Sequence, residues 1–113
     1  MPVEIPELWR QTVAELLRNG RADQVLIRQR ARRDWSDLFP DSFDYQLRDA
    51  LADALEREVT SGTRHEMEEP GETYGFTFHH AGRAIYGKVN LAAPDRIVIV
   101  YSAHRPLLGK ETV

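Results

Sequence analysis

The sequence predicts an α+β fold in which two or three N-terminal helices pack on one face of an antiparallel β-meander of three or four strands. Apolar residues recur with helical spacing up to residue 60 and alternate with a period of two from residue 73. The length of 113 residues suits a single domain with one core. We expect a helical part at 1–60, an acidic loop at 61–72 and an antiparallel sheet at 73–106.

The first helix is predicted to begin at Pro6, because an apolar stripe of Trp9, Val13, Leu16 and Leu17 follows it. The pair Asn19-Gly20 predicts that the helix ends in a left-handed turn. Residues 22–38 have two interpretations, since Val25-Leu26-Ile27 fits a short buried strand whereas Gln29 to Arg33 favours a helix. We expect a helix there.

The third helix has the strongest pattern in the chain. Phe39-Pro40 ends the segment before it, and Asp41 and Ser42 are predicted to cap the new helix. Its apolar positions recur at i, i+4 and i+7, and they are Phe43, Leu47, Ala50, Leu51, Ala54, Leu55 and Val59.

Two strands are predicted at 72–80 and 83–91, joined by the turn-forming Ala81-Gly82. If His80 lies opposite Arg83, the apolar faces of both strands coincide, because Phe78 then faces Ile85. The opposite face then carries a shared polar set, which consists of Thr73, Thr77, His79, Tyr86, Lys88 and Asn90.

Residues 96–102 predict a third strand that is apolar on both faces, as in the middle of a sheet, while a fourth strand within 63–69 stays optional. Pairing Leu91 with Ile97 would place Tyr86 opposite Ser102 and bring His104 to the polar face beside His79. A turn that differs by one residue would move His104 to the core face and put Arg105 in its place. The sequence does not choose between these registers.

Composition excludes several classes of function. The absence of cysteine excludes disulfides, thiolate catalysis, zinc ribbons and iron–sulfur clusters. Phosphate-binding, dinucleotide-binding and zinc-protease motifs are also missing. Because the chain has neither a targeting pattern nor a long apolar run, we expect a cytoplasmic protein that does not enter membranes.

Charge is distributed unevenly along the chain. The net charge of −3 divides into −1 for residues 1–50, −5 for residues 51–72 and +3 for residues 73–113, which also hold three of the four histidines. Such a basic region either packs near the acidic middle or meets a polyanion. Its composition suits metal-free cleavage of RNA, which needs a base, an acid and cations on the phosphate.

Six residues are the candidates for that chemistry. We assign catalysis to His104, His79, Lys88 and Tyr86, and substrate binding to Arg83 and Arg105. Since His79 and His80 are adjacent in a strand they point to opposite faces, so one of them is structural, and His65 in the acidic loop is the weakest candidate. The histidine spacing predicts no metal site, and no cofactor is expected. A second basic cluster, Arg28, Arg30, Arg32 and Arg33, is a secondary candidate for phosphate contact.

The strings GRAIYGKVNL and RIVIVYSAHRP make the region from Tyr74 to Leu108 resemble the small toxin ribonucleases of the RelE and motility-quorum-sensing-regulator type. The resemblance implies a compact α+β protein that cleaves messenger RNA and is blocked by an antitoxin. It would match Tyr86 and Lys88 to a Tyr-x-Lys strand, and His104 with Arg105 to the polar end of the last strand. Typical members are strongly basic, whereas this chain is acidic and has only two lysines.

Two hypotheses about function follow. The first is a small metal-independent endoribonuclease of toxin–antitoxin type, with RNA and an antitoxin as partners. The second is a noncatalytic protein-binding or regulatory module, such as an immunity-like protein or a phage-encoded inhibitor, that uses the acidic loop or the polar sheet face. The substrate and the oligomeric state are left open.

Overall fold

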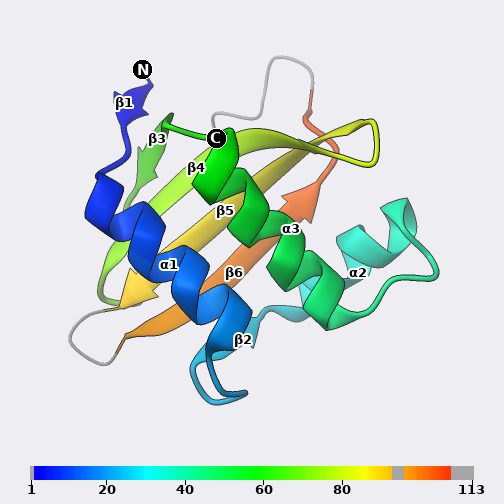
Figure 1. Cartoon of the computed structure of the whole chain (residues 1–113), viewed down its shortest axis with the longest axis horizontal. Coiled ribbons are helices and arrows are strands. Elements are labelled where there is room, and N and C mark those ends of the chain that lie inside the picture. Colours follow the sequence, from blue (N-terminus) through cyan, green and yellow to red (C-terminus); the bar gives the residue numbers. More distant parts are fainter. Residues whose placement is uncertain (1, 93–95, 108–113) are drawn as a thin grey trace.

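A computed structural model describes residues 2–92 and 96–107, and it has the α+β fold that the sequence predicts. The strands form one sheet in the order β1-β3-β4-β5-β6-β2 (Figure 1). All neighbouring strands are antiparallel except β2 and β6, which are parallel. The elements are β1 (Val3–Glu4), α1 (Glu7–Asn19), β2 (Val25–Ile27), α2 (Gln29–Leu38), α3 (Asp44–Arg57), β3 (Ser61–His65), β4 (Glu72–His80), β5 (Arg83–Ala92) and β6 (Ile97–His104).

The sheet is larger than predicted and is mixed, so the prediction of an antiparallel meander with three or four strands was only partly correct. The three additional strands, β1, β2 and β3, have only two, three and five residues. Strands this short show almost no alternation, and they form because longer strands offer them hydrogen-bonding edges. Consequently the region 1–60 is not purely helical, and 61–72 is not only a loop.

Helices α1 and α3 lie side by side across one face of the sheet (Figure 1). The core between them and the strands includes Val13, Leu51, Phe78 and Ile85, all of which are fully buried. The guanidinium of Arg48 in α3 donates hydrogen bonds to the last carbonyl groups of α1. The Leu17 carbonyl oxygen thereby gains a partner at the helix C-terminus, while the Leu16 oxygen also accepts from the Gly20 amide, and the bonds fix the two helices to each other.

Two helix ends differ from the prediction. Gly20 follows α1 in an extended conformation with φ −69°, so the left-handed turn was wrong. Helix α3 begins at Asp44, and its N-cap is Phe43 rather than the predicted Asp41 or Ser42. The hydroxyl of Ser42 instead accepts a hydrogen bond of 2.7 Å from the Trp35 indole, and the Gln46 side chain accepts one from the Phe43 amide.

The segment predicted as one helix at 22–38 divides into a strand and a helix. Strand β2 pairs with the first half of β6, and α2 then lies along the second half of β6 at the sheet edge. The buried Trp35 and Ala31 hold α2 in this position. Therefore two helices cover the sheet face and the third flanks it (Figure 1).

The hairpin of β4 and β5 has the predicted register, with His80 opposite Arg83 and Phe78 opposite Ile85. Of the two registers that the sequence left open for the next hairpin, the structure has the one shifted by one residue, in which Leu91 pairs with Val98 instead of Ile97. A bulge at Tyr101 then adds one residue to β6, so that Tyr86 faces His104 rather than Ser102. The one-residue shift of the pairing and the one-residue bulge compensate each other, so His104 lies on the same face of the sheet as Tyr86.

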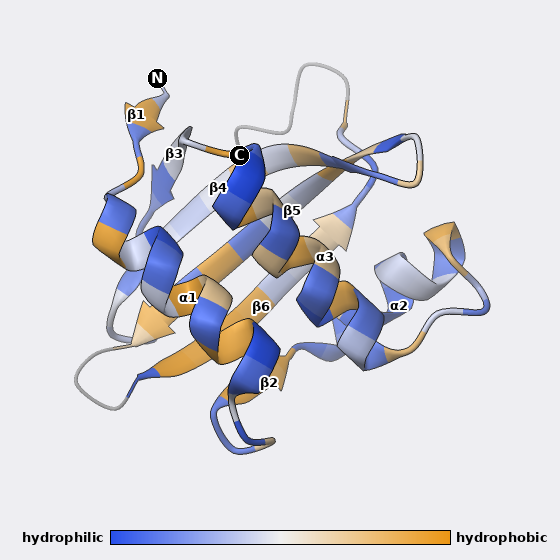
Figure 2. Cartoon of the chain, in the orientation of Figure 1, coloured by the Kyte–Doolittle hydropathy of each residue, from blue (hydrophilic) through white to orange (hydrophobic). Residues whose placement is uncertain are grey.

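Strand β6 changes character along its length, from hydrophobic where it pairs with β2 to more polar near its end (Figure 2). The four hydrophobic residues Ile97 to Val100 precede Tyr101, Ser102 and His104. As predicted, this apolar strand lies inside the sheet, between β5 and β2. None of the helices that the structure describes is long and apolar enough to cross a membrane.

Candidate functional site

We call the side of the sheet opposite α1 and α3 the open face. The β3–β4 loop, residues 66–71, covers one half of it. Asn90 and Thr73 are buried there, and the Asn90 amide donates to the Pro70 carbonyl oxygen at 3.1 Å. At the far side Glu69 accepts hydrogen bonds from the Tyr101 hydroxyl and the Arg28 guanidinium. The loop thus extends across the sheet from β3 to β6.

The other half of the open face carries the candidate site, which consists of His65, Tyr86, Lys88, Ser102 and His104. Tyr86 pairs with His104 across β5 and β6, and Lys88 pairs with Ser102. The rings of Tyr86 and His104 are tilted to each other with their centroids 5.4 Å apart. Alternation along β5 points Tyr86 and Lys88 to the same side. The bulge at Tyr101 is therefore what brings His104 into the site.

Gly75 makes room for a contact between Tyr86 and His65. The Tyr86 hydroxyl lies over Gly75 and forms a hydrogen bond of 3.1 Å with Nε2 of His65. A Cβ at Gly75 would lie 2.9 Å from that nitrogen and closer still to the hydroxyl. Burial raises the pKa of Tyr86. Burial, together with the charge of Lys88, lowers the pKa of His65, so this pair is uncharged at neutral pH.

Lys88 is the cation at the centre of the site. Burial lowers its pKa, and the positive charge of Arg30 lowers it further. Among the described residues no carboxylate oxygen lies within 4.0 Å of its ammonium group. A half-buried ammonium group without a paired carboxylate favours an incoming anion.

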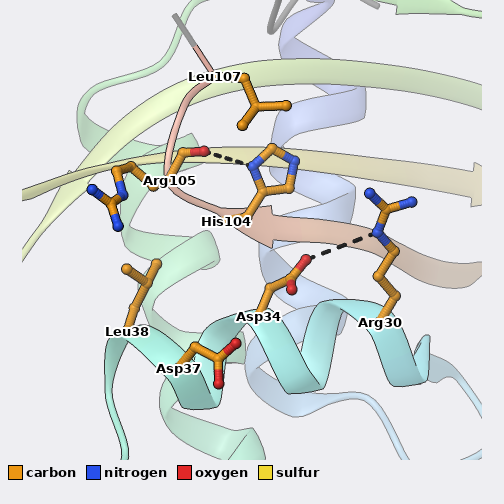
Figure 3. Close-up of a pocket in the computed structure, with 7 residues that line it drawn as sticks. All are labelled: Arg30, Asp34, Asp37, Leu38, His104, Arg105 and Leu107. Atoms are coloured by element: carbon orange, nitrogen blue, oxygen red, sulfur yellow. Dashed lines mark hydrogen bonds and ion pairs between the residues drawn. The ribbon is translucent and has the colours of Figure 1, made fainter.

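His104 has a defined tautomer because Nδ1 lies 2.7 Å from the carbonyl oxygen of Arg105 (Figure 3). A carbonyl oxygen only accepts hydrogen bonds, so Nδ1 of the neutral ring carries the proton. Nε2 then presents its lone pair. An imidazole held this way can act as a general base.

The remaining predicted site residues lie elsewhere. His79 is turned to Glu58, with Nδ1 2.7 Å from a carboxylate oxygen, and this contact lowers the pKa of Glu58. Arg83 stacks over the ring of Phe39. Arg105 extends away from the His104 ring (Figure 3). The structure therefore groups His104, Tyr86 and Lys88, and it leaves His79, Arg83 and Arg105 outside the group.

Two residues of the site region were underestimated from the sequence, His65 and Arg30. His65 was assigned to a loop, but it lies in β3 opposite Thr73. Treating the optional strand as paired with that register would have placed His65 on the polar face. Arg30 acts on Lys88 because α2 runs beside β6, which is a tertiary relation without a local sequence signal.

Within residues 2–92 and 96–107, no three side chains of histidine, cysteine, aspartate or glutamate are grouped in a way that could hold a metal ion. The groups available for chemistry are the imidazole lone pair of His104, the ammonium group of Lys88 and the phenol of Tyr86. No family model, no curated protein and no solved structure matches this chain.

Proposed function

We propose that this protein is a small metal-independent endoribonuclease of toxin type, which cleaves single-stranded RNA on the uncovered half of the open face. The observation that carries the proposal is the convergence of His104, Tyr86 and Lys88 on adjacent positions of β5 and β6. The resemblance of the two strand sequences to toxin ribonucleases supports the same activity. It also supports messenger RNA as the substrate and an antitoxin as the partner.

In the proposed reaction His104 acts as the base. Its Nε2 removes the proton from a ribose 2′-hydroxyl, whose oxygen attacks the adjacent phosphorus. The hydrogen bond from Nδ1 to the Arg105 carbonyl orients the ring and stabilises the imidazolium that forms. This step requires RNA, because DNA has no 2′-hydroxyl.

Lys88 stabilises the negative charge that grows on the phosphate. As the bond between phosphorus and the 5′-oxygen breaks, that oxygen takes a proton from the ammonium group, whose lowered pKa makes it a better acid. The products are a 2′,3′-cyclic phosphate and a 5′-hydroxyl end. Tyr86 is only 5% exposed, so in this proposal its ring, held by the hydrogen bond to His65, positions the neighbouring ring of His104.

The test uses the purified chain with an end-labelled single-stranded RNA and the DNA of the same sequence, both with a metal chelator present. We expect cleavage of the RNA only, with cyclic phosphate ends. Lys88→Met should reduce the rate about a hundredfold or more, because one charge-stabilising group is removed. Arg21→Met, on the exposed loop after α1, is the control and should retain the wild-type rate. Cleavage of both polymers, or none by a folded protein, would contradict the proposal.

One observation favours the second hypothesis, a noncatalytic protein-binding module. The rings of Phe43 and Tyr45 stack on each other at the start of α3 while both side chains are more than half exposed. Exposed aromatic pairs are typical of protein contacts. If the folded protein leaves RNA intact, the replacement Phe43→Ser tests this surface by loss of a captured partner.

A further inference from the structure

A pocket of about 310 Å³ lies between α2 and the end of β6, directly beside the candidate site. His104 belongs to both, since it forms part of the pocket wall and also contacts Tyr86. Figure 3 shows side chains that approach this space from α2 and from the chain after β6. The lining residues are Arg30, Asp34, Asp37, Leu38, His104, Arg105 and Leu107.

Helix α2 presents its polar face to this pocket. Positions 30, 34, 37 and 38 recur at intervals of three and four residues, so they share one side of the helix, while Trp35 is buried in the core. Asp34 is 27% exposed and meets Arg30 only at 4.0 Å. Asp37 has no ion pair or side-chain hydrogen bond to any described residue. Two carboxylates beside His104 therefore keep acceptor oxygens available to a ligand.

The charges that line the pocket indicate whether it would bind the phosphate or the base of a nucleotide. The two carboxylates, Asp34 and Asp37, are balanced in the pocket lining by the guanidinium groups of Arg30 and Arg105. The pocket therefore has no excess positive charge for a phosphate, which is attracted more strongly to Lys88, a cation without a paired carboxylate among the described residues. A base is neutral, and its flat faces suit the apolar side chains of Leu38 and Leu107. The carboxylates would accept hydrogen bonds from N–H groups on the edge of that base.

Guanine matches this arrangement best among the four standard bases. Its Watson–Crick edge carries two adjacent donors, N1–H and the 2-amino group, which a carboxylate can accept together. Uracil offers one ring N–H, and adenine and cytosine offer only an amino group. Resting on the ribonuclease function proposed above, we infer that the pocket binds the base next to the cleaved phosphate and selects guanine through Asp34 or Asp37.

The first experiment measures binding without cleavage. The 3′-monophosphates of guanosine, inosine, adenosine, cytidine and uridine are titrated into the full chain by calorimetry. We expect guanosine to bind most tightly and inosine, which lacks the 2-amino group, to bind more weakly. Asp34→Asn with Asp37→Asn should reduce the preference for guanosine about tenfold or more. Asp23→Asn, whose carboxylate pairs with Arg21 away from the pocket, is the control and should keep the preference.

The second experiment separates the two proposals by mapping cleavage in an RNA of mixed sequence. The wild type should cleave next to guanine, and the double variant should cleave with less selectivity. Cleavage without base preference, or a preference that the double variant keeps, would contradict guanine selection by the pocket but would still support the ribonuclease function. If the RNA stays intact while guanosine binds selectively and the double variant loses this selectivity, the ribonuclease function is contradicted and guanine binding by the pocket is supported.

Discussion

The two faces of the sheet are built from the same strands and differ in almost every other respect. The face under α1 and α3 is a continuous apolar layer that includes Phe76, Phe78 and Val89. The open face carries the polar side chains of β4 and β5 together with Ile97 and Ile99 of β6, and the β3–β4 loop covers only half of it. Successive residues along β4 and β5 therefore point alternately into the core and onto the open face.

In this short chain, stability and the candidate site therefore depend on opposite faces of one sheet. A change on the helix face removes packing, whereas a change of an exposed side chain on the open face, such as Thr77, removes little of what holds the fold together. A change on the covered half of the open face should have an intermediate effect on the free energy of unfolding, because the polar groups there are buried and hydrogen-bonded. Five substitutions test this gradation.

The largest effect is expected from Phe78→Ala on the helix face. The Phe78 side chain is fully buried, so its loss should reduce the free energy of unfolding by about 3–5 kcal/mol. Thr77→Ala, one residue earlier and exposed on the open face, should change it by about 0.5 kcal/mol or less. Urea denaturation followed by tryptophan fluorescence measures both, and equal losses would contradict the division between the faces.

Gly75→Ala should have the next largest effect. The new Cβ would come within 2.8 Å of Cζ of Tyr86, so the ring must move away from His65. Overpacking of this kind costs about 1–3 kcal/mol, and it should also lower the rate of RNA cleavage. In a Tyr86→Ala background the destabilisation by Gly75→Ala should shrink, since the ring is gone. A cost that is the same in both backgrounds would show that the ring is not the obstacle.

Asn90→Ala tests the covered half of the open face. The substitution leaves the Thr73 hydroxyl and the Pro70 carbonyl without their partner. We expect a loss of about 1–2 kcal/mol and faster hydrogen exchange in residues 66–71. Unchanged exchange in the loop, measured by mass spectrometry, would mean that Asn90 does not hold it.

The smallest effect is expected from Glu69→Gln, and it should depend on pH. The hydrogen bond from Tyr101 and the charge of Arg28 lower the pKa of Glu69 in the folded protein. The folded pKa therefore lies below the unfolded value of roughly 4.3, so the stabilisation is complete above that pH and is lost as the pH falls through the folded pKa.

Urea denaturation of both proteins between pH 7 and pH 3 measures this dependence. The wild type should be the more stable protein at pH 7, and the difference should vanish in acid. The same contact and burial raise the pKa of Tyr101 to about 12, so the phenol keeps its proton throughout. A difference that grows as the pH falls would contradict the assignment.

The parts of the fold that the sequence predicts are those with local, repeated patterns. The register of β4 and β5 follows from alternation on both strands and from the Ala81-Gly82 turn, in which both residues have positive φ. The register of β5 and β6 could not be predicted, because Ile97 to Val100 is apolar on both faces and matches either pairing. The bulge at Tyr101 has no sequence signal of its own.

The residues of the candidate site divide in the same way. Tyr86 and Lys88 were assigned to one polar face from pairing parity alone, and the confirmed register places them there. His65 was missed because β3 is recognisable only through its long-range pairing with β4. His79 has the parity of the polar face, but its side chain turns to Glu58, which follows α3 and is distant in sequence.

The central claim is that His104, and not His79, belongs to the reactive half of the open face. The most direct measurement is the rate at which purified His104→Gln and His79→Gln cleave one single-stranded RNA, after urea denaturation has shown that both fold. We predict a loss of about a hundredfold or more for His104→Gln, because general base catalysis is removed, and a rate within about twofold of wild type for His79→Gln. Equal rates for the two variants, or the larger loss for His79→Gln, would contradict the account.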